Sequence, residues 1–594
     1  MCGIFGYLGN QTSGAQIVLE GLKKLEYRGY DSWGIALRLA PLAQGQLELL
    51  VEKHIGKISN ARLNGLPQSN TALGHTRWAT HGGVSEENAH PHLDCTGKIA
   101  VIHNGIIENY DRIKKNLLKS GHKFVSNGDS EVVGHLIEEY LSKMCFKEAF
   151  RKAFLCLSGL NAVIALDARS GAFLAAKTGS PLVVGLGKEE NFLASDAQAL
   201  LSHTRQVHFI QDNELVELLP GKVNFYSTKN GKVKKPKIVT LDWEIEEAFL
   251  GKYPHFMIKE IMEQPKVIGA IAQNAVETIP DLAKIIKSAF GTYIVGCGSA
   301  SYACLAGTYL FSRIAKKHVN FALGSEFGYA LDFLTPKSLV IALSQSGETM
   351  DIIESVAKTQ KKKAKVLAIV NSFGSTLYRM GDYKMLLGAG PEKSVLATKS
   401  VTAQIAVLLL LAYSLDGGLK EGNKLLSRSV LAVNNLFKDR SLEHIKKLAS
   451  LIANASNIYI VGRGQSYPIA MEAALKIKEV TYIHAEGFAA GELKHGVIAL
   501  IEKGTPCIVF APLDETFGAV LSGAMEMKAR GGFIIGISPK NHEVFDYHIP
   551  VSDCGEATMI PNVVVAQLLA YYLALKLNRD PDKPRNLAKS VTVK

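Results

Sequence analysis

The chain has 594 residues, 47% of them hydrophobic and 21% charged, and its formal net charge is +12. This length exceeds what one hydrophobic core supports and predicts about three or four domains, while the composition excludes a largely disordered protein. The basic residues form no stripe interleaved with aromatic residues, so we expect no nucleic-acid partner; small acidic substrates suit the charge better.

The cysteines and the apolar runs indicate a cytoplasmic protein. Eight cysteines show no CxxC pair and no regular framework, which is typical of a reducing compartment. The apolar stretch at the N-terminus is short and lacks a basic segment, so we expect no secretory signal. The longest apolar runs, 405–415 and 563–575, are shorter than the ~20 residues of a membrane helix and predict buried helices.

Residues 1–238 alternate short strand patterns with helical ones. Strands are predicted at GIALRL, KIAVIHNG, NAVIALD and SPLVVGLG. Val18, Leu22 and Leu25 share one face of a predicted helix, and 131–141 has the same periodicity. The Lys- and Gly-containing stretch 227–237 marks the end of this region. A connector, 239–276, follows and contains an amphipathic segment at 242–265.

The second half of the chain contains an internal repeat. TYIVGCGSASYACL (292–305) matches IYIVGRGQSYPIAM (458–471), and two further pairs follow in the same order: 339–349 with 506–516, and 365–372 with 531–538. A period of about 167 residues is too long for a solenoid and indicates two duplicated domains. Each copy alternates short strands with helices, which predicts a parallel sheet covered by helices on both faces.

The chain opens with MCGIFGY, and Cys2 has two interpretations. It can be an ordinary small residue at the start of a strand. Alternatively, removal of Met1 would leave Cys2 with a free α-amine, pKa about 7.7–8.0, beside its own thiol. The amine could then accept the thiol proton and activate the residue as a nucleophile.

Three further clusters favour the nucleophile. HTRWATHGGVSEENAHPH (75–92) and HNGIIENY (103–110) follow or end predicted strands, and NGDSEV (127–132) places Asp129 at a predicted helix N-cap. Taken singly, these are a surface arginine, a turn and a cap. Together they supply what amide hydrolysis of glutamine needs: an arginine for the α-carboxylate, an aspartate for the α-ammonium, and an oxyanion site at Asn104 and the Gly105 N–H. The HPH triplet lacks a complete zinc ligand set, so no metal is expected there.

With EYRGYDS (26–32), these motifs resemble the class II glutamine amidotransferase domain, an N-terminal-nucleophile αββα sandwich, over about the first 240 residues. The resemblance implies that Cys2 is the nucleophile and that Asn104 and Gly105 form the oxyanion hole. It also implies a glutamine pocket of five residues: Arg77, Thr80, His81, Gly105 and Asp129.

The segment LVIALSQSGET (339–349) predicts a phosphate site. A strand ends in Ser344, Gln345, Ser346 and Gly347, and Thr349 stands at the start of a predicted helix. Hydroxyls, a glycine and a helix N-terminus suit a phosphate, although a turn that merely caps a helix has the same pattern. The second copy reads APLDET, so we expect only the first copy to hold phosphate.

The duplication resembles paired sugar isomerase (SIS) domains with doubly wound parallel sheets, at 277–416 and 449–585, followed by a tail, 586–594. Three stretches narrow the family: 392–400 (EKSVLATKS), 474–496 (ALKIKEVTYIHAEGFAAGELKHG) and 584–594 (PRNLAKSVTVK). With the first half, the whole chain resembles the glutamine–fructose-6-phosphate aminotransferase family. That family makes glucosamine 6-phosphate and glutamate from fructose 6-phosphate and glutamine, the first step of hexosamine synthesis, without cofactor or metal and as a homodimer.

The resemblance also implies the roles of individual residues. Seven would bind the sugar phosphate: Ser299, Ser344, Gln345, Ser346, Thr349, Val395 and Lys476. Glu479 would move a proton between C1 and C2, His495 would assist ring opening, and Lys589 would form a Schiff base with the ketose. Trp78 and Arg585 would gate an ammonia channel. One departure is CGSASY (297–302), where Ala300 or Ser301 replaces a phosphate-contacting serine.

Other functions fit less well. An asparagine synthetase would need an SGGxDS-type ATP loop, and a phosphoribosyl transferase would need a strand that ends in paired acidic residues. A SIS-type regulator would carry a DNA-binding domain.

The C-terminal tail follows a Pro-rich break (580–584), so we expect an extended segment. Alternation at Leu587, Val591 and Val593 predicts that one side of it is buried.

Overall fold

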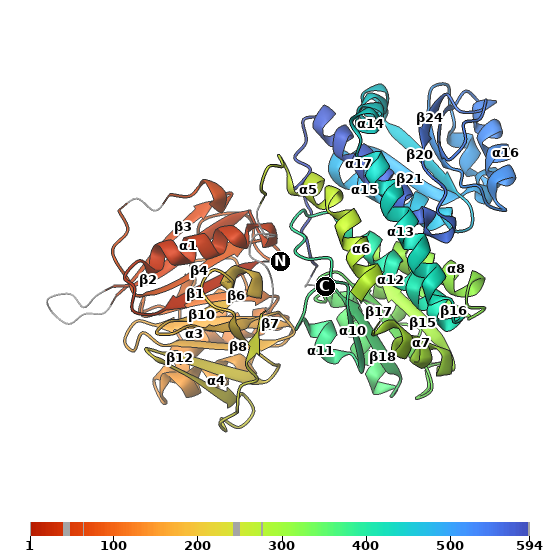
Figure 1. Cartoon of the computed structure of the whole chain (residues 1–594). Helices are drawn as coiled ribbons and strands as arrows, with labels where there is room; N and C mark the ends of the chain where they lie inside the picture. Colours follow the sequence, from red (N-terminus) through yellow and green to blue (C-terminus); the bar gives the residue numbers. More distant parts are fainter. Residues whose placement is uncertain (1, 40–47, 63–64, 242–249, 275–276, 592–594) are drawn as a thin grey trace. The chain divides into compact units, whose positions relative to one another are not determined.

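The computed structural model describes residues 2–39, 48–62, 65–241, 250–274 and 277–591. The chain divides into two compact units, Met1–Glu246 with Ser590–Lys594, and Glu247–Lys589. Figure 1 colours them along the chain, and each unit is described by itself.

The first unit contains two antiparallel sheets. The eight-stranded sheet has the order β14-β11-β9-β10-β1-β4-β2-β3, with strands β1 (Gly3–Leu8), β2 (Ser32–Arg38), β3 (Leu49–Ile55), β4 (Thr71–Arg77), β9 (Val183–Leu186), β10 (Asn191–Ala194), β11 (Gln206–Phe209) and β14 (Val239–Thr240). The six-stranded sheet has the order β13-β12-β8-β7-β6-β5, with strands β5 (His92–Leu93), β6 (Ile99–Gly105), β7 (Asn161–Asp167), β8 (Phe173–Thr178), β12 (Glu214–Leu219) and β13 (Lys222–Ser227).

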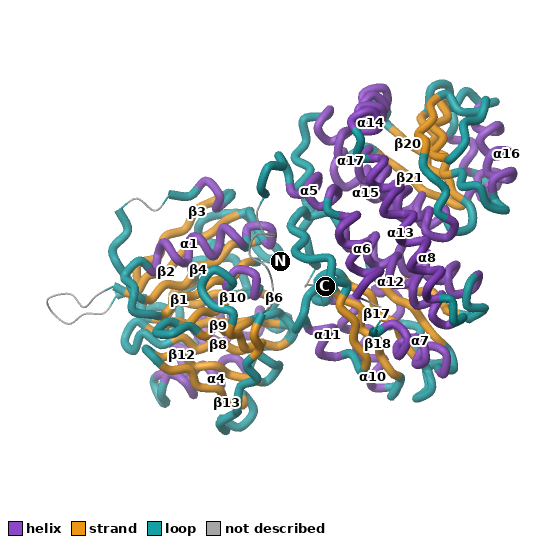
Figure 2. Tube along the Cα trace, viewed as in Figure 1, coloured by secondary structure: helices purple, strands orange, loops and turns teal. Residues whose placement is uncertain are grey.

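The two sheets and the helices on their outer faces form four layers, as Figure 2 shows by its strand and helix colours. In β1, Ile4 and Leu8 join the core between the two sheets, whereas Phe5 and Tyr7 face the layer of α1 (Gly14–Lys24). The strand is apolar on both faces because both are covered. The far face of the six-stranded sheet packs against helices, among them α2 (Tyr110–Lys119), α3 (Glu131–Leu141) and α4 (Phe146–Leu155). The predicted αββα sandwich is confirmed.

The second unit contains two five-stranded parallel sheets. The first has the order β16-β15-β17-β18-β19 and the second β21-β20-β22-β23-β24. The strands are β15 (Thr292–Gly296), β16 (Val319–Leu323), β17 (Leu339–Ser344), β18 (Lys365–Val370), β19 (Tyr383–Leu386), β20 (Asn457–Gly462), β21 (His484–Ala489), β22 (Pro506–Phe510), β23 (Phe533–Ser538) and β24 (Tyr547–Pro550). Both sheets follow one topology, so the predicted duplication into doubly wound domains is confirmed.

Helices surround both sheets: α5 (Phe256–Met262), α6 (Gln264–Asn274), α7 (Ile279–Ser288), α8 (Ser299–Arg313), α9 (Gly324–Phe327), α10 (Met350–Lys361), α11 (Thr376–Met380), α12 (Lys399–Leu415), α13 (Leu419–Leu436), α14 (Asp439–Ile452), α15 (Ser466–Thr481), α16 (Phe517–Lys528) and α17 (Met559–Lys576). One core of buried apolar side chains runs through the two sheets, since it includes Ile294 of β15 and Ile460 of β20. The two repeats are therefore packed as one body.

The expected connector 239–276 is largely structured. Val239 pairs with Val207 of β11, so the first unit's sheet continues past residue 238. Met257 and Ile261 of α5 lie in the core of the second unit. Residues 242–249 lie outside the described residues.

The apolar runs form α12 and α17, as predicted. Among the described residues, one helical stretch, Gly555–Lys576, is long and apolar enough to cross a membrane, and 89% of its apolar window is buried inside the protein. Such burial is what a core helix requires. The tail after α17 contains no helix up to residue 591, as predicted. The expected burial of Val591 is wrong, because this side chain is 52% exposed; Val593 lies outside the described residues.

Candidate active sites

The Cys2 thiol lies at the N-terminal edge of β1, against the loop that follows β4. Its Sγ accepts a hydrogen bond from the Trp78 N–H at 3.2 Å and lies 3.6 Å from the Trp78 carbonyl oxygen. Gly3, the next residue, pairs with Thr76 of β4, which fixes this position. Burial raises the pKa of the Cys2 thiol, and the Trp78 N–H lowers it in part. A buried thiol needs a nearby proton acceptor to become a nucleophile.

Asn104 stands beside Cys2 at the end of β6. Its Nδ2 donates to the Cys2 carbonyl oxygen at 2.9 Å, and its Oδ1 lies 3.0 Å from Nε2 of His75. Burial lowers the pKa of His75 to about 3, so the imidazole is neutral and its Nε2–H donates to the amide. His75 therefore fixes which end of the Asn104 amide faces the nucleophile. Sequence reasoning missed His75, although it opens the motif 75–92.

Gly105 has a backbone conformation that only glycine tolerates there. Its φ is +134°, and a Cβ would collide with the carbonyl oxygen of Leu160. The chain bends at this point, directly after Asn104 and at the edge of the six-stranded sheet. Asn104 and Gly105 thus end the strand next to the thiol, where an oxyanion site requires donors.

Arg77 is buried, and its guanidinium shapes the loop after β4. It donates to the carbonyl oxygens of His81 (2.6 Å), Gly82 (3.2 Å) and Gly83 (3.0 Å). The neighbouring Thr80 is exposed, and the His81 ring packs edge-on against Tyr110 at 5.0 Å. The described contacts of Arg77 therefore hold the loop that carries Thr80 and His81.

Asp129 is buried, but it is not the predicted helix cap. The N-cap of α3 is Ser130. The Asp129 carboxylate instead accepts the Ile107 N–H at 2.7 Å and the Ser130 hydroxyl at 3.2 Å. This tertiary contact ties the loop before α3 to the segment after β6, and so brings Asp129 to the Asn104–Gly105 side of the sheet.

The predicted phosphate turn in the first SIS repeat joins β17 to α10. Ser344 Oγ lies 2.9 Å from Thr349 Oγ1 and accepts the Gly347 N–H at 3.0 Å, and Ser346 Oγ accepts the Glu348 N–H at 3.1 Å. Gly347 has φ +65°, and a Cβ would collide with the Ser375 hydroxyl. Thr349 is the N-cap of α10, as predicted.

The matching turn of the second repeat contains a carboxylate. Asp514 Oδ1 accepts the Thr516 N–H at 2.8 Å and the Thr516 hydroxyl at 2.6 Å. Thr516 is the N-cap of α16. An anionic side chain therefore takes the donors that a phosphate would use in this copy.

Lys476 on α15 links the two repeats. Its fully buried Nζ donates to Ser299 Oγ at 3.0 Å, at the start of α8, and forms ion pairs with Glu479 at 2.7 Å and Glu472 at 3.5 Å. Burial opposes the charge, but these carboxylates raise the pKa of Lys476. Burial also raises the pKa of Glu472 to about 7. Glu472 was missed, although it precedes Lys476 by one helical turn.

In the loop 297–302, which departs from the family pattern, the Ser301 hydroxyl lies within its own turn. It donates to the Gly298 carbonyl oxygen at 2.6 Å. Of the two hydroxyls, Ser299 is the one that contacts Lys476.

Lys589 in the tail is held against the segment 392–400. Its Nζ donates to Glu392 Oε2 at 2.6 Å and to the Leu396 carbonyl oxygen at 3.0 Å. Lys476 reaches the next carbonyl oxygen, that of Ala397, at 3.4 Å. Two lysines from distant parts of the sequence thus meet one short stretch, beside Val395, whose N–H donates to the Asp582 carbonyl oxygen.

Two buried carboxyl groups, Glu392 and Glu260, lie beneath this stretch. Glu392 accepts the N–H groups of Thr398 and Ser400, and Lys589 with these bonds lowers its pKa to about 2 despite burial. Burial, and then Glu392, raise the pKa of Glu260 to about 8. Sequence reasoning found neither carboxylate as a site residue.

Four further predicted residues are His495, Gln345, Arg585 and Trp78. His495 is exposed at the end of a short 3-10 helix, Ala490–His495. Gln345 is half-buried, and its carbonyl oxygen accepts the Asn371 N–H at 3.0 Å. The Arg585 guanidinium lies 4.2 Å from the centre of the Tyr482 ring, and Trp78 packs edge-on against Tyr30.

Comparison with known proteins agrees with this geometry. The glutamine amidotransferase domain matches residues 75–202, and the SIS domain matches residues 285–414 and 451–577. The fold and the two sites thus define a glutamine amidotransferase joined to paired SIS domains.

Full-length relatives define the family more closely. A glutamine–fructose-6-phosphate aminotransferase [isomerizing] of Pyrococcus horikoshii is 43% identical, and one of Thermococcus kodakarensis is 41% identical, each over 100% of both chains. The C-terminal domain of glucosamine-fructose-6-phosphate aminotransferase from Francisella tularensis is 29% identical, with a TM-score of 0.51, over 56% of this chain and 99% of that chain. The chain belongs to the glutamine–fructose-6-phosphate aminotransferase (isomerizing) family, and it is an enzyme.

Proposed function

We propose that the protein converts D-fructose 6-phosphate and L-glutamine to D-glucosamine 6-phosphate and L-glutamate. The observation that carries this proposal is the convergence of Lys476 and Lys589 on adjacent carbonyl oxygens of one segment, in a chain whose first unit places Cys2 beside Asn104. One part supplies chemistry for a ketose, and the other supplies ammonia. Full-length similarity to the named aminotransferases supports the pairing of these two reactions.

In the first unit, the Cys2 thiolate attacks the side-chain amide of glutamine. The α-amine freed by removal of Met1 takes the thiol proton and passes it to the leaving ammonia. The Asn104 Nδ2 and the Gly105 N–H stabilise the oxyanion, and water then releases glutamate from the thioester. Asp129 accepts the α-ammonium of glutamine, and Arg77, with the loop of Thr80 and His81, surrounds its α-carboxylate.

In the second unit, the first repeat holds the sugar phosphate. Ser344, Gln345, Ser346 and Thr349, with the N-terminus of α10, form the phosphate site. Ser299, Val395 and Lys476 complete the sugar-phosphate site. The neutral Lys476–Glu479 ion pair adds little net charge there. The second repeat cannot take this role, because Asp514 would repel the phosphate.

The amine of Lys589 attacks C2 of the open-chain ketose and forms an imine with loss of water. The nucleophile is the neutral amine, so the Lys589 ammonium must first lose a proton; Glu392, 2.6 Å away, stays ionised with a pKa of about 2 and orients the lysine. Ammonia then replaces the lysine at C2. Glu479 moves a proton from C1 to C2, which yields the aldose. His495 assists the ring opening that precedes these steps.

Ammonia must travel from the first site to the second without loss to water. By resemblance, Trp78 and Arg585 gate that path. We further propose a cytoplasmic homodimer that acts on these two small substrates, binds neither nucleic acid nor membrane, and needs no cofactor.

The test measures glutamate and glucosamine 6-phosphate with and without fructose 6-phosphate. We expect equal amounts of both products when the sugar is present, and glutamate alone when it is absent. Glutamate release with no amino sugar under either condition would contradict the proposal and indicate a different ammonia acceptor.

A further inference from the structure

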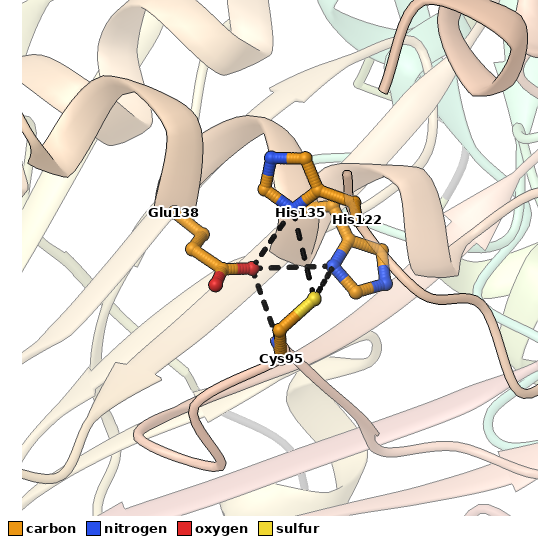
Figure 3. Close-up of side chains that lie close together, drawn as sticks. All are labelled: Cys95, His122, His135 and Glu138. Carbon is orange, nitrogen blue, oxygen red and sulfur yellow. Dashed lines mark hydrogen bonds and ion pairs between the residues drawn. The ribbon is translucent and has the colours of Figure 1, made fainter. Parts of the chain in front are cut away.

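Four potential metal ligands meet in the first unit, on the outer face of the six-stranded sheet (Figure 3). Cys95 follows β5, His122 follows α2, and His135 and Glu138 lie one turn apart on α3. Their ligand atoms, Cys95 Sγ, both histidine Nδ1 atoms and Glu138 Oε2, all lie within 4.8 Å of one another. The HPH triplet (90–92), for which no metal was expected, is not part of this cluster; His90 stacks on His75.

The distances within this cluster fit a tetrahedral zinc ion. Zinc–sulfur bonds of about 2.3 Å and zinc–nitrogen or zinc–oxygen bonds of about 2.0 Å place tetrahedral ligands about 3.5 Å (S to N) and about 3.3 Å (N to O) apart. Cys95 Sγ lies 3.7 Å from His122 Nδ1 and 3.4 Å from His135 Nδ1. Glu138 Oε2 lies 3.1 and 3.3 Å from the same two nitrogens. Ordinary hydrogen bonds would not require these four separations to match a tetrahedral zinc site at the same time.

A second ring of carboxylates supports the two imidazoles. His122 Nε2 lies 3.0 Å from Glu139, and His135 Nε2 lies 3.5 Å from Glu131. His122 thus has the arrangement in which metal-binding histidines are usually held, with a carboxylate hydrogen-bonded to the nitrogen that does not bind the metal, and His135 has a carboxylate at ion-pair distance. His135 and Glu131 are buried, so the inner side of the cluster is preformed.

The charges of the cluster also favour a cation. Each imidazole lies between two carboxylates, and a thiol contacts both rings. A divalent ion in the centre would be bound directly by the thiolate, both imidazoles and the Glu138 carboxylate.

We propose that Cys95, His122, His135 and Glu138 bind one zinc ion as a structural site. A thiolate, two imidazoles and a carboxylate in tetrahedral geometry suit zinc among the biological divalent metals. Four protein ligands close the coordination sphere, so the ion holds structure and does not activate water. A cavity of about 880 Å³, lined in part by Cys95, Glu131 and His135, gives the ion a way in.

The ion would clamp three segments that the fold brings together: the turn after β5, the loop between α2 and α3, and α3 itself. That loop continues to Asp129, which precedes α3 and binds the Ile107 N–H. Zinc would therefore restrain the loop that carries a proposed glutamine-binding residue. Binding of the metal itself does not depend on the proposed function.

The direct test is metal content. Protein purified without chelator is dialysed against metal-free buffer and analysed for zinc, and metal-free protein is then titrated with Co²⁺. We expect about one zinc per chain and, with Co²⁺, the near-ultraviolet thiolate band and strong visible bands of a tetrahedral cobalt–sulfur site. Cys95→Ser should lose the thiolate band, and Glu139→Gln, outside the coordination sphere, should weaken zinc binding about 10- to 100-fold.

Matched controls separate this site from other thiols. Cys145→Ser changes another exposed cysteine of the same unit, and Cys2→Ala removes the catalytic candidate; both should retain one zinc and the cobalt spectrum. Zinc should also raise the unfolding temperature of the parent protein and of Cys145→Ser, but not that of folded Cys95→Ser. Zinc binding equal in the parent and Cys95→Ser, or a cobalt spectrum lost in Cys2→Ala, would overturn the proposal.

Discussion

Asp514 accepts hydrogen bonds from both the amide and the hydroxyl of Thr516, whereas in the corresponding turn of the first repeat Ser344 and Thr349 face each other at 2.9 Å. The two turns share a fold and differ in charge. One presents hydroxyl donors at a helix N-terminus, which suits a dianionic phosphate, and the other is already neutralised by a carboxylate. This difference supports the proposal that only the first repeat binds the sugar phosphate.

This asymmetry predicts unequal effects of substitution. Ser346→Ala combined with Thr349→Ala should weaken fructose 6-phosphate binding by about 2–5 kcal/mol, because two charge-assisted hydrogen bonds are lost. Calorimetric titration measures the change. Asp514→Ala with Thr516→Ala is the matched control and should change affinity little; equal losses in the two pairs would show that both turns bind the sugar.

Replacement of the Cys2 thiol should separate the two half-reactions. Cys2→Ala should abolish glutamate release, because no other thiol faces Asn104 among the described residues, and should leave fructose 6-phosphate affinity unchanged. Intact-mass spectrometry of the parent should show a chain that starts at Cys2. A fully active enzyme that retains Met1 would contradict the mechanism, since its Cys2 nitrogen would be an amide.

The oxyanion geometry makes a second, finer prediction for this site. Asn104→Ala removes the donor beside Cys2 and should lower the rate constant of glutamine hydrolysis about 10²–10³-fold, with a smaller effect on KM. His75→Ala should lower it less, because His75 acts only by orienting the Asn104 amide. A His75→Ala enzyme with a KM defect alone would show that His75 shapes the pocket instead.

Glu472 predicts a pH dependence of stability. Its pKa is about 7 in the folded protein and near 4.5 when unfolded, so between these values the folded state binds more protons than the unfolded state. Stability therefore falls as pH rises from about 4.5 to 7, by about 3 kcal/mol at most. Glu472→Gln mimics the protonated acid and should flatten this decline.

Urea unfolding of the parent and the variant at pH 5 and pH 8 measures that difference. Glu486→Gln, an exposed carboxylate of the same domain, is the control and should follow the parent. Parallel pH profiles for the parent and Glu472→Gln would mean that Glu472 is ionised throughout.

The fold could be predicted wherever local pattern and burial agree. Residues 131–141 were expected to be helical, and α3 has those bounds; the repeated strands were expected to build parallel sheets and do so. Tertiary contacts decided the exceptions. Asp129 binds Ile107 across the fold and leaves the cap to Ser130, and no local pattern records that contact.

The sites were predicted through motifs, and the residues around those motifs were not. Glu260 contacts the N–H of Ser394 across more than a hundred residues, so periodicity cannot reveal it. Cys95 and His122 lie in separate loops, and only the fold brings them to α3. Glu472 could have been found, because the spacing from Lys476 places both on one helix face.

Lys589 offers the sharpest test of the sugar chemistry. Its side chain is 5% exposed and its nitrogen faces the fully buried Glu392, so the tail brings an amine to a polar, enclosed position. Lys589→Ala should retain glutamine hydrolysis but form almost no glucosamine 6-phosphate, because the imine at C2 cannot form. Borohydride added with fructose 6-phosphate should trap the sugar on Lys589 in the parent enzyme, as peptide mass spectrometry would show.

Two variants distinguish this role from a structural one. Lys589→Arg keeps a cation for Glu392 and should preserve stability, yet it should also fail to form the amino sugar or the trapped adduct. Lys583→Ala changes another lysine near the same tail and should be trapped by borohydride as the parent is. Normal synthesis by either Lys589 variant would remove the tail from the chemistry. Because removing one partner leaves a buried charge unpaired, Lys589→Ala should also unfold at lower temperature than Lys589→Arg, and this difference separates the loss of the ion pair from the loss of the nucleophile.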